Sequence, residues 1–194
     1  FLTGLLSFWV VDSGLALILA YFASLFILFL GKNISFKNSV KAGTLFVLNL
    51  VIIFGLINLF HIFLGLKTID FANIFLRLRQ YTQAGFGMLP MESQTYFWLV
   101  ILIYFASIIY FFKNNFQGVS AILIFIANLS LTSCAYYIGR SHPHNLFHIS
   151  IFPILNLFLL IGLKLKNKTS NIQLLTSVVL FLFFIAKFIL ISLF

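Results

Sequence analysis

The sequence predicts an all-α integral membrane protein with about six transmembrane helices, in one domain over residues 1–194. Its mean hydropathy is +1.15, and 62% of its residues are hydrophobic while only 8% are charged. This composition excludes a soluble globular domain. Six apolar runs come close to the roughly 20 residues that a helix needs to cross a bilayer. They are residues 15–30, 42–64, 96–112, 119–138, 143–163 and 172–192.

Polar and helix-breaking residues predict where these helices begin and end. The first run either reaches back to Phe1 as one long tilted helix or is broken at Asp12-Ser13-Gly14. Gly139 predicts the end of the fourth helix. Pro143 suits the first turn of the fifth helix, because its missing N–H would be unpaired there anyway. Pro153 lies further into that run and predicts a kink, because it removes a backbone hydrogen bond.

Basic residues in the loops predict which side of the membrane each loop faces. The second and fourth loops carry four basic residues together with Asp70 and Glu92, so we expect these loops to face outward. The first, third and fifth loops carry seven lysines and no acidic residue, so we expect them to be cytoplasmic, in a bacterial inner membrane. These are Lys32, Lys37, Lys41, Lys113, Lys164, Lys166 and Lys168. Because the net charge of +9 is spread over short loops, it does not predict nucleic-acid binding.

The second loop, residues 66–95, contains the pattern of an amphipathic helix. Asp70 is a favourable N-cap, and Gly85 is placed to end a helix. Between them, apolar residues recur at helical spacing, with polar residues on the opposite face. The apolar positions are Phe71, Ile74, Phe75 and Leu78. We therefore expect a helix that lies in the interface plane of the membrane.

Three charged residues of this loop are candidates for function. Arg77 and Arg79 either extend to lipid headgroups from a surface helix or bind an anionic lipid or a lipid-linked phosphate. Glu92 is a candidate catalytic base, although no partner for it is recognisable in the sequence.

The fourth loop contains the densest polar cluster of the chain, in residues 139–148. Arg140 is a planar bidentate donor suited to phosphate, and a following helix would point its N-terminal amides at the same anion. The cluster therefore predicts a phosphate or diphosphate site formed by Arg140, His142, His144 and His148. One alternative is a divalent metal site, but no carboxylate or cysteine stands at ligand spacing, so no metal or other cofactor is predicted. The other alternative is that these residues only terminate helices.

Three further ionisable residues lie in or near the apolar runs. Asp12 is a candidate proton or cation site, because it is the acid nearest to a span. His61 is either a hydrogen-bonded interfacial histidine or a catalytic base, and haem ligation with His148 would require both rings at one depth. Lys187 either extends to the membrane surface, pairs within the bundle or lines a transport path.

Two segments together resemble a known family. The sequence Phe-Leu-Arg-Leu-Arg at 75–79 and the later Tyr-Tyr-Ile-Gly-Arg-Ser-His-Pro at 136–143 are similar to the C-terminal half of bacterial polytopic GT-C-class glycosyltransferases. The resemblance implies an interfacial helix in an outer loop and basic residues near a polyprenyl phosphate. It also implies acidic catalytic residues in the first outer loop, upstream of Phe1, so we expect this chain to be part of a longer protein.

The leading functional hypothesis is therefore a membrane glycosyltransferase of cell-envelope glycans or lipids. It would use a lipid-linked, polyprenyl-phosphate sugar donor on the non-cytoplasmic face, with membrane lipids as its other partners. The first alternative is a transporter or flippase with Asp12, His61 and Lys187 along its path. The second is a non-catalytic assembly subunit of the membrane. No feature of the sequence predicts an oligomeric state.

Overall fold

A computed structural model describes residues 11–70, 72, 73, 76, 97–114, 119–135, 137 and 150–166. Over these residues all regular structure is helical and there is no strand, so the all-α prediction is confirmed. The helices are α2 (Val11–Leu30), α3 (Phe36–Phe63), α5 (Phe97–Asn114), α6 (Val119–Ser133) and α9 (Ile151–Lys166).

Three of these helices are long and apolar enough to cross a membrane, and they cover Ser13–Leu30, Phe36–Phe63 and Phe97–Asn114. Two others, Val119–Ser133 and Ile151–Leu163, are apolar but shorter. The sixth predicted run, residues 172–192, lies outside the described residues, so the count of six spans stays a prediction.

Two predictions about helix ends can be compared with the structure. Helix α2 begins at Val11 and runs through Asp12-Ser13-Gly14, so the chain is not broken there. Helix α9 begins at Ile151, so Pro153 lies in its first turn rather than in its interior. The first N–H groups of a helix have no partner within it, so proline removes no hydrogen bond at this position. The kink predicted at Pro153 is therefore wrong for the helix as described.

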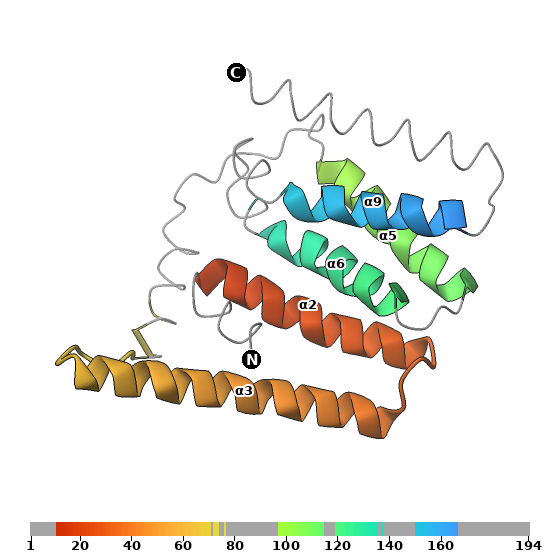
Figure 1. Ribbon diagram of the computed structural model, residues 1–194. Helices are drawn as coiled ribbons and strands as arrows, with labels where there is room; N and C mark the ends of the chain where they lie inside the picture. The colour runs from red at the N-terminus through yellow and green to blue at the C-terminus, as the bar shows by residue number, and fades with distance from the viewer. Residues whose placement is uncertain are drawn as a thin grey trace, which may run out of the picture.

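Helix α6 is the centre of the bundle (Figure 1). It packs against α2 on one side and against α5 and α9 on the other, while α3 lies outside α2. Helix α3 is attached to α2 through Tyr21 and Phe46, whose rings stack with centroids 4.2 Å apart. The Tyr21 hydroxyl also donates to the Ala42 carbonyl over 3.3 Å. Much of α3 remains uncovered, and Val51, Leu59 and Phe63 are 62–86% exposed, as expected for a helix that faces lipid.

The interface between α2 and α6 is built on small side chains. Ala16, Ala20 and Ser24 are spaced by four residues on α2, and all three are buried. Small residues at this spacing let two membrane helices approach closely. The approach is close enough for Thr132 Oγ1, on α6, to donate to the Ala16 carbonyl of α2 over 2.9 Å.

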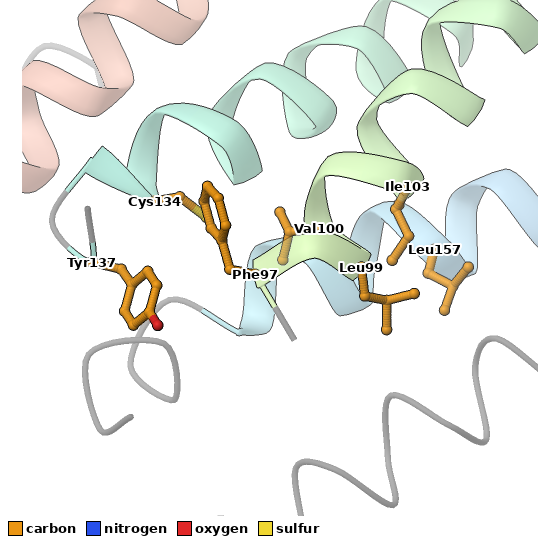
Figure 2. Packing of buried hydrophobic residues seen from close by; sticks show 7 residues of the cluster. All are labelled: Phe97, Leu99, Val100, Ile103, Cys134, Tyr137 and Leu157. Atoms are coloured by element: carbon orange, nitrogen blue, oxygen red, sulfur yellow. The ribbon is translucent and has the colours of Figure 1, made fainter. Parts of the chain in front are cut away.

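The interface of α5 with α6 and α9 is built instead on large apolar side chains (Figure 2). The Phe97 and Tyr137 rings lie with centroids 5.7 Å apart, and Cys134 lies beside them, fully buried. The whole cluster contains Phe97, Leu99, Val100, Ile103, Cys134, Tyr137 and Leu157. It ties the beginning of α5 to the residues that follow α6.

Consecutive helices run in opposite directions, so their connections alternate between two ends of the bundle (Figure 1). At one end, Gly31 after α2 lies against Phe111 near the end of α5, and a Cβ atom on Gly31 would be 2.6 Å from that ring. We call this the lysine end, because Lys32, Lys37, Lys41 and Lys113 lie in or beside its connections. At the opposite end, α3 and α6 finish while α5 and α9 begin. The second and fourth loops therefore leave and re-enter the bundle at that same opposite end, which we call the polar-loop end.

Candidate functional site

The interior of the bundle contains a polar group that the sequence analysis missed. Asn128, on α6, is only 2% exposed. Its Nδ2 donates to Ser24 Oγ of α2 over 3.0 Å and to the Ile124 carbonyl of its own helix over 2.9 Å. Its Oδ1 accepts from the Tyr104 hydroxyl of α5 over 3.4 Å. One asparagine thus connects three helices.

A second buried asparagine joins α5 to α9. Asn156 is fully buried, and its Oδ1 lies 3.2 Å from Ser107 Oγ, which also lies 2.9 Å from the Ile103 carbonyl. Within the described residues, Asn156 Nδ2 and Ser120 Oγ have no hydrogen-bond partner although both atoms are buried. A buried donor without a partner lowers stability in an apolar interior. The contact between Asn156 Oδ1 and Ser107 therefore comes with a cost at Asn156 Nδ2.

These interior groups are suited to hold helices together rather than to do chemistry. Apart from the Tyr110 and Tyr137 hydroxyls and the Cys134 thiol, the buried polar side chains of the described residues are all serine or asparagine. Neither type exchanges protons near neutral pH, so neither can act as a general acid or base. In lipid, however, serine and asparagine hydrogen bonds between helices stabilise helix association. These serine and asparagine groups therefore serve to hold the described helices together.

The Asn128–Ser24 bond gives a stability prediction. A double-mutant cycle with Asn128→Ala and Ser24→Ala should show a coupling of about 0.6–1.7 kcal/mol, the range for such bonds in membranes. The measurement is unfolding in mixed micelles with increasing denaturing detergent. Asn49→Ala is the control, because Asn49 Nδ2 bonds only the Leu45 carbonyl of its own helix and should show no coupling to Ser24. A coupling of zero between Ser24 and Asn128 would contradict the hydrogen bond between these two side chains.

The end of α3 is organised by two polar side chains, His61 and Asn58. His61 Nδ1 lies 2.8 Å from the Lys67 carbonyl. Because a carbonyl can only accept, Nδ1 is the donor in this hydrogen bond. Asn58 Oδ1 accepts from the Ile69 amide over 2.7 Å, so the chain after α3 folds back on its last turn. This geometry fits the hydrogen-bonded interfacial histidine among the interpretations of His61.

The start of the predicted amphipathic helix is also seen. Asp70 Oδ1 accepts from the Ala72 amide over 2.8 Å, and Oδ2 accepts from Asn73 Nδ2 over 2.9 Å. Ala72, Asn73 and Leu76 are helical. Asp70 is thus the N-cap that the sequence predicted. The remainder of that helix, including Phe71, lies outside the described residues.

The other predicted site residues are placed only in part. Asp12 lies in the first turn of α2, at the polar-loop end that also holds His61. Eight candidates lie outside the described residues, namely Arg77, Arg79, Glu92, Arg140, His142, His144, His148 and Lys187. Among the residues that are described, no three His, Cys, Asp or Glu side chains are grouped as a metal would require.

What the fold does bring to one end of the bundle is the set of helix ends that flank the second and fourth loops. The loop with Arg77 and Arg79 connects Phe63 to Phe97, and the loop with Arg140 connects Ser133 to Ile151. All four helix ends lie at the polar-loop end. No protein-family model matches the chain, and no similar protein was found among curated proteins or solved structures.

Proposed function

We propose that this protein is a membrane glycosyltransferase that takes its sugar from a polyprenyl-phosphate-linked donor. The observation that supports the proposal most is the shared position of the second and fourth loops. Both leave and re-enter the bundle at the polar-loop end, and the contact between Phe97 and Tyr137 joins the end of one loop to the start of the other. Basic residues of both loops can therefore act on one anion.

The chemistry follows from the charges of these two loops. A polyprenyl-phosphate donor leaves behind a phosphate anion when its sugar is transferred, so negative charge develops on the leaving group. Arg140 would supply a planar pair of N–H donors for two oxygens of the leaving phosphate. Charge stabilisation of this kind is a large contribution to catalysis. Arg77, Arg79 and the histidines of the cluster attract the same headgroup. The polyprenyl chain stays in the lipid beside the exposed apolar helix faces.

A transfer assay tests this proposal. The full-length protein, in membranes or detergent, is given a radiolabelled polyprenyl-phosphate sugar, and label is followed into glycan or lipid products. We expect transfer from the lipid-linked donor and none from the matching nucleotide-sugar. The opposite donor preference would overturn the proposal. Absence of transfer, with donor flux across proteoliposomes that depends on Asp12 and Lys187, would instead support the transporter.

The orientation of the loops gives a separate prediction. Single cysteines are placed at Gln83, Asn145, Asn114 and Asn167 after the buried Cys134 has been replaced by serine. In intact cells, a membrane-impermeant thiol reagent should label Gln83→Cys and Asn145→Cys and leave the other two protected. The reason is the excess of lysine in the first, third and fifth loops.

Two other labelling patterns would contradict the topology in different ways. The reverse pattern would turn the polar-loop end toward the cytoplasm, where soluble nucleotide-sugars are available. It would therefore count against the proposal that the sugar donor is lipid-linked. Labelling of Gln83→Cys and Asn145→Cys from opposite sides would break the count of six spans. It would also separate the two loops on which the site depends.

A further inference from the structure

The lysine end carries a feature that the proposed function does not use. A groove of about 600 Å³ lies between α2 and α3, within the size range of small-ligand sites. Its walls are mostly apolar, from Phe22, Phe26 and Phe29 of α2 and from Val40 and Val47 of α3, among others.

One wall of the groove is shaped by a glycine. Gly43 lines it, and a Cβ atom there would lie 3.3 Å from the Phe22 ring. The groove extends to Phe29 and Phe36, the residues next to the loop between the two helices. It therefore runs from the apolar body of the helices toward the surface at the lysine end.

Three lysines lie at the same end of the two helices, beside the residues that line the groove, and among the described residues no acidic side chain accompanies them. Lys32, Lys37 and Lys41 are all exposed, and Lys37 and Lys41 are one turn apart at the start of α3. There is no acidic residue between positions 13 and 69 of the sequence. The helix dipoles add little net charge here, because the positive N-terminus of α3 lies beside the negative C-terminus of α2, so the charge comes from the lysines. A ligand for this place should be apolar along the groove and negative at its mouth.

The backbone conformation of Lys32 is a second indication that a ligand binds here. Helices α2 and α3 end in the same hydrogen-bond pattern, with bonds from Asn33 N to the Leu28 carbonyl and from Leu66 N to the His61 carbonyl. This ending places one residue in the left-handed region, where glycine is favoured. After α3 that residue is Gly65, at φ +69°, but after α2 it is Lys32, at φ +58°. A lysine kept in a conformation that costs stability suggests that its side chain is needed there.

We propose that this groove binds one acyl chain of an anionic phospholipid whose phosphate is held by Lys32, Lys37 and Lys41. A phospholipid is the one abundant ligand of a membrane that joins an apolar chain to a phosphate at the interface. Lysine stems lie along apolar surface while their ammonium groups reach the headgroup layer. The site lies at the opposite end of the bundle from the proposed sugar-transfer site. A test of lipid binding here therefore does not depend on whether the protein transfers sugar.

Lipid titration of the full-length protein, followed by native mass spectrometry, tests the site. Phosphatidylglycerol and phosphatidylcholine with identical acyl chains are compared. We expect phosphatidylglycerol to bind at least about tenfold more tightly, since each lysine near an anionic surface contributes roughly a fivefold effect. Glycerol phosphate, which has the charge but no chain, should not compete. Equal affinities for the two lipids, or full competition by glycerol phosphate, would overturn the proposal.

Variants separate the headgroup contacts from the groove. Lys32→Gly combined with Lys37→Gln and Lys41→Gln should abolish the preference for phosphatidylglycerol, whereas Lys67→Gln, at the other end of α3, should leave it unchanged. Val47→Trp should fill the groove and lower the binding affinity for both phospholipids by the same factor.

Lys32→Gly alone should change lipid affinity and thermal stability in opposite directions. It should lower phosphatidylglycerol affinity about fivefold yet raise the thermal midpoint of the lipid-free protein, because glycine relieves the left-handed backbone. Unchanged lipid affinity in this variant, or an unchanged preference in the triple variant, would exclude the lysines as the headgroup site.

Discussion

Ala20→Leu is expected to lower the free energy of unfolding by about 1–3 kcal/mol, the usual cost of overfilling a packed core. Ala20 is fully buried where α2 faces α6. Three added carbon atoms would force the two helices apart. The separation would also stretch the bonds that cross this interface, from Thr132 to the Ala16 carbonyl and from Asn128 to Ser24, so the effect should fall at the upper end of the range.

Detergent-induced unfolding, followed by circular dichroism, measures this loss. Leu19→Ala is the matched control, because Leu19 is the neighbouring residue and is 58% exposed. Its substitution removes about the same volume that Ala20→Leu adds, but on the face turned away from α6, and should change stability little. Equal effects of the two substitutions would mean that α2 does not pack on α6 through Ala20.

The helical class and the rough positions of five helices could be predicted because apolar length is a local property of sequence. Helix ends were less accurate, because polar side chains rather than hydropathy set them. The second apolar run was expected over 42–64, whereas α3 begins at Phe36. The six added residues include Lys37 and Lys41, which ended the apolar run. Ser35, however, caps the helix by accepting from the Asn38 amide over 3.3 Å, and exposed lysines are compatible with a helix at a membrane surface.

The pairing of helices could not be predicted from hydropathy, because every helix here is apolar on most sides. Two signals for it were nevertheless present. Ala16, Ala20 and Ser24 repeat at the four-residue spacing of close helix packing, and Asn128 and Asn156 interrupt otherwise apolar runs. A polar side chain inside a membrane helix faces the bundle interior as a rule. Because Asn128 and Asn156 carry no charge, they do not stand out beside the arginines and histidines of the loops, and neither was predicted to join helices.

The candidate site was predicted from side-chain chemistry alone, and its residues in the second and fourth loops lie outside the described residues. Asp70 shows what sequence can establish locally, since an N-cap depends on residues two or three positions away. Whether Arg77 and Arg140 share one anion depends instead on how residues far apart in the chain are folded. The alternation of helix directions brings the helix ends that flank their loops to one end of the bundle, which agrees with the side that the loop charges had indicated.

Arg140→Ala is expected to reduce sugar transfer from a polyprenyl-phosphate donor by about 100-fold, comparable to the loss of one donor that stabilises charge in a transition state. The expectation rests on the proposed function and on the position of Arg140 in the fourth loop. Because the charge grows as the sugar leaves, the fall should appear in kcat more than in KM. Initial rates over a range of donor concentrations measure both.

Two further variants distinguish the role of Arg140 from a general effect of charge. Arg140→Lys keeps the charge but loses the paired donors, so it should recover only part of the rate. Lys113→Gln removes one positive charge at the lysine end and should leave transfer unchanged. Full activity in Arg140→Ala would exclude Arg140 from the mechanism. An equal fall in Lys113→Gln would attribute the loss to the net charge of the protein. A rise in KM with kcat unchanged would limit Arg140 to holding the donor, because it would then bind the ground state and the transition state equally.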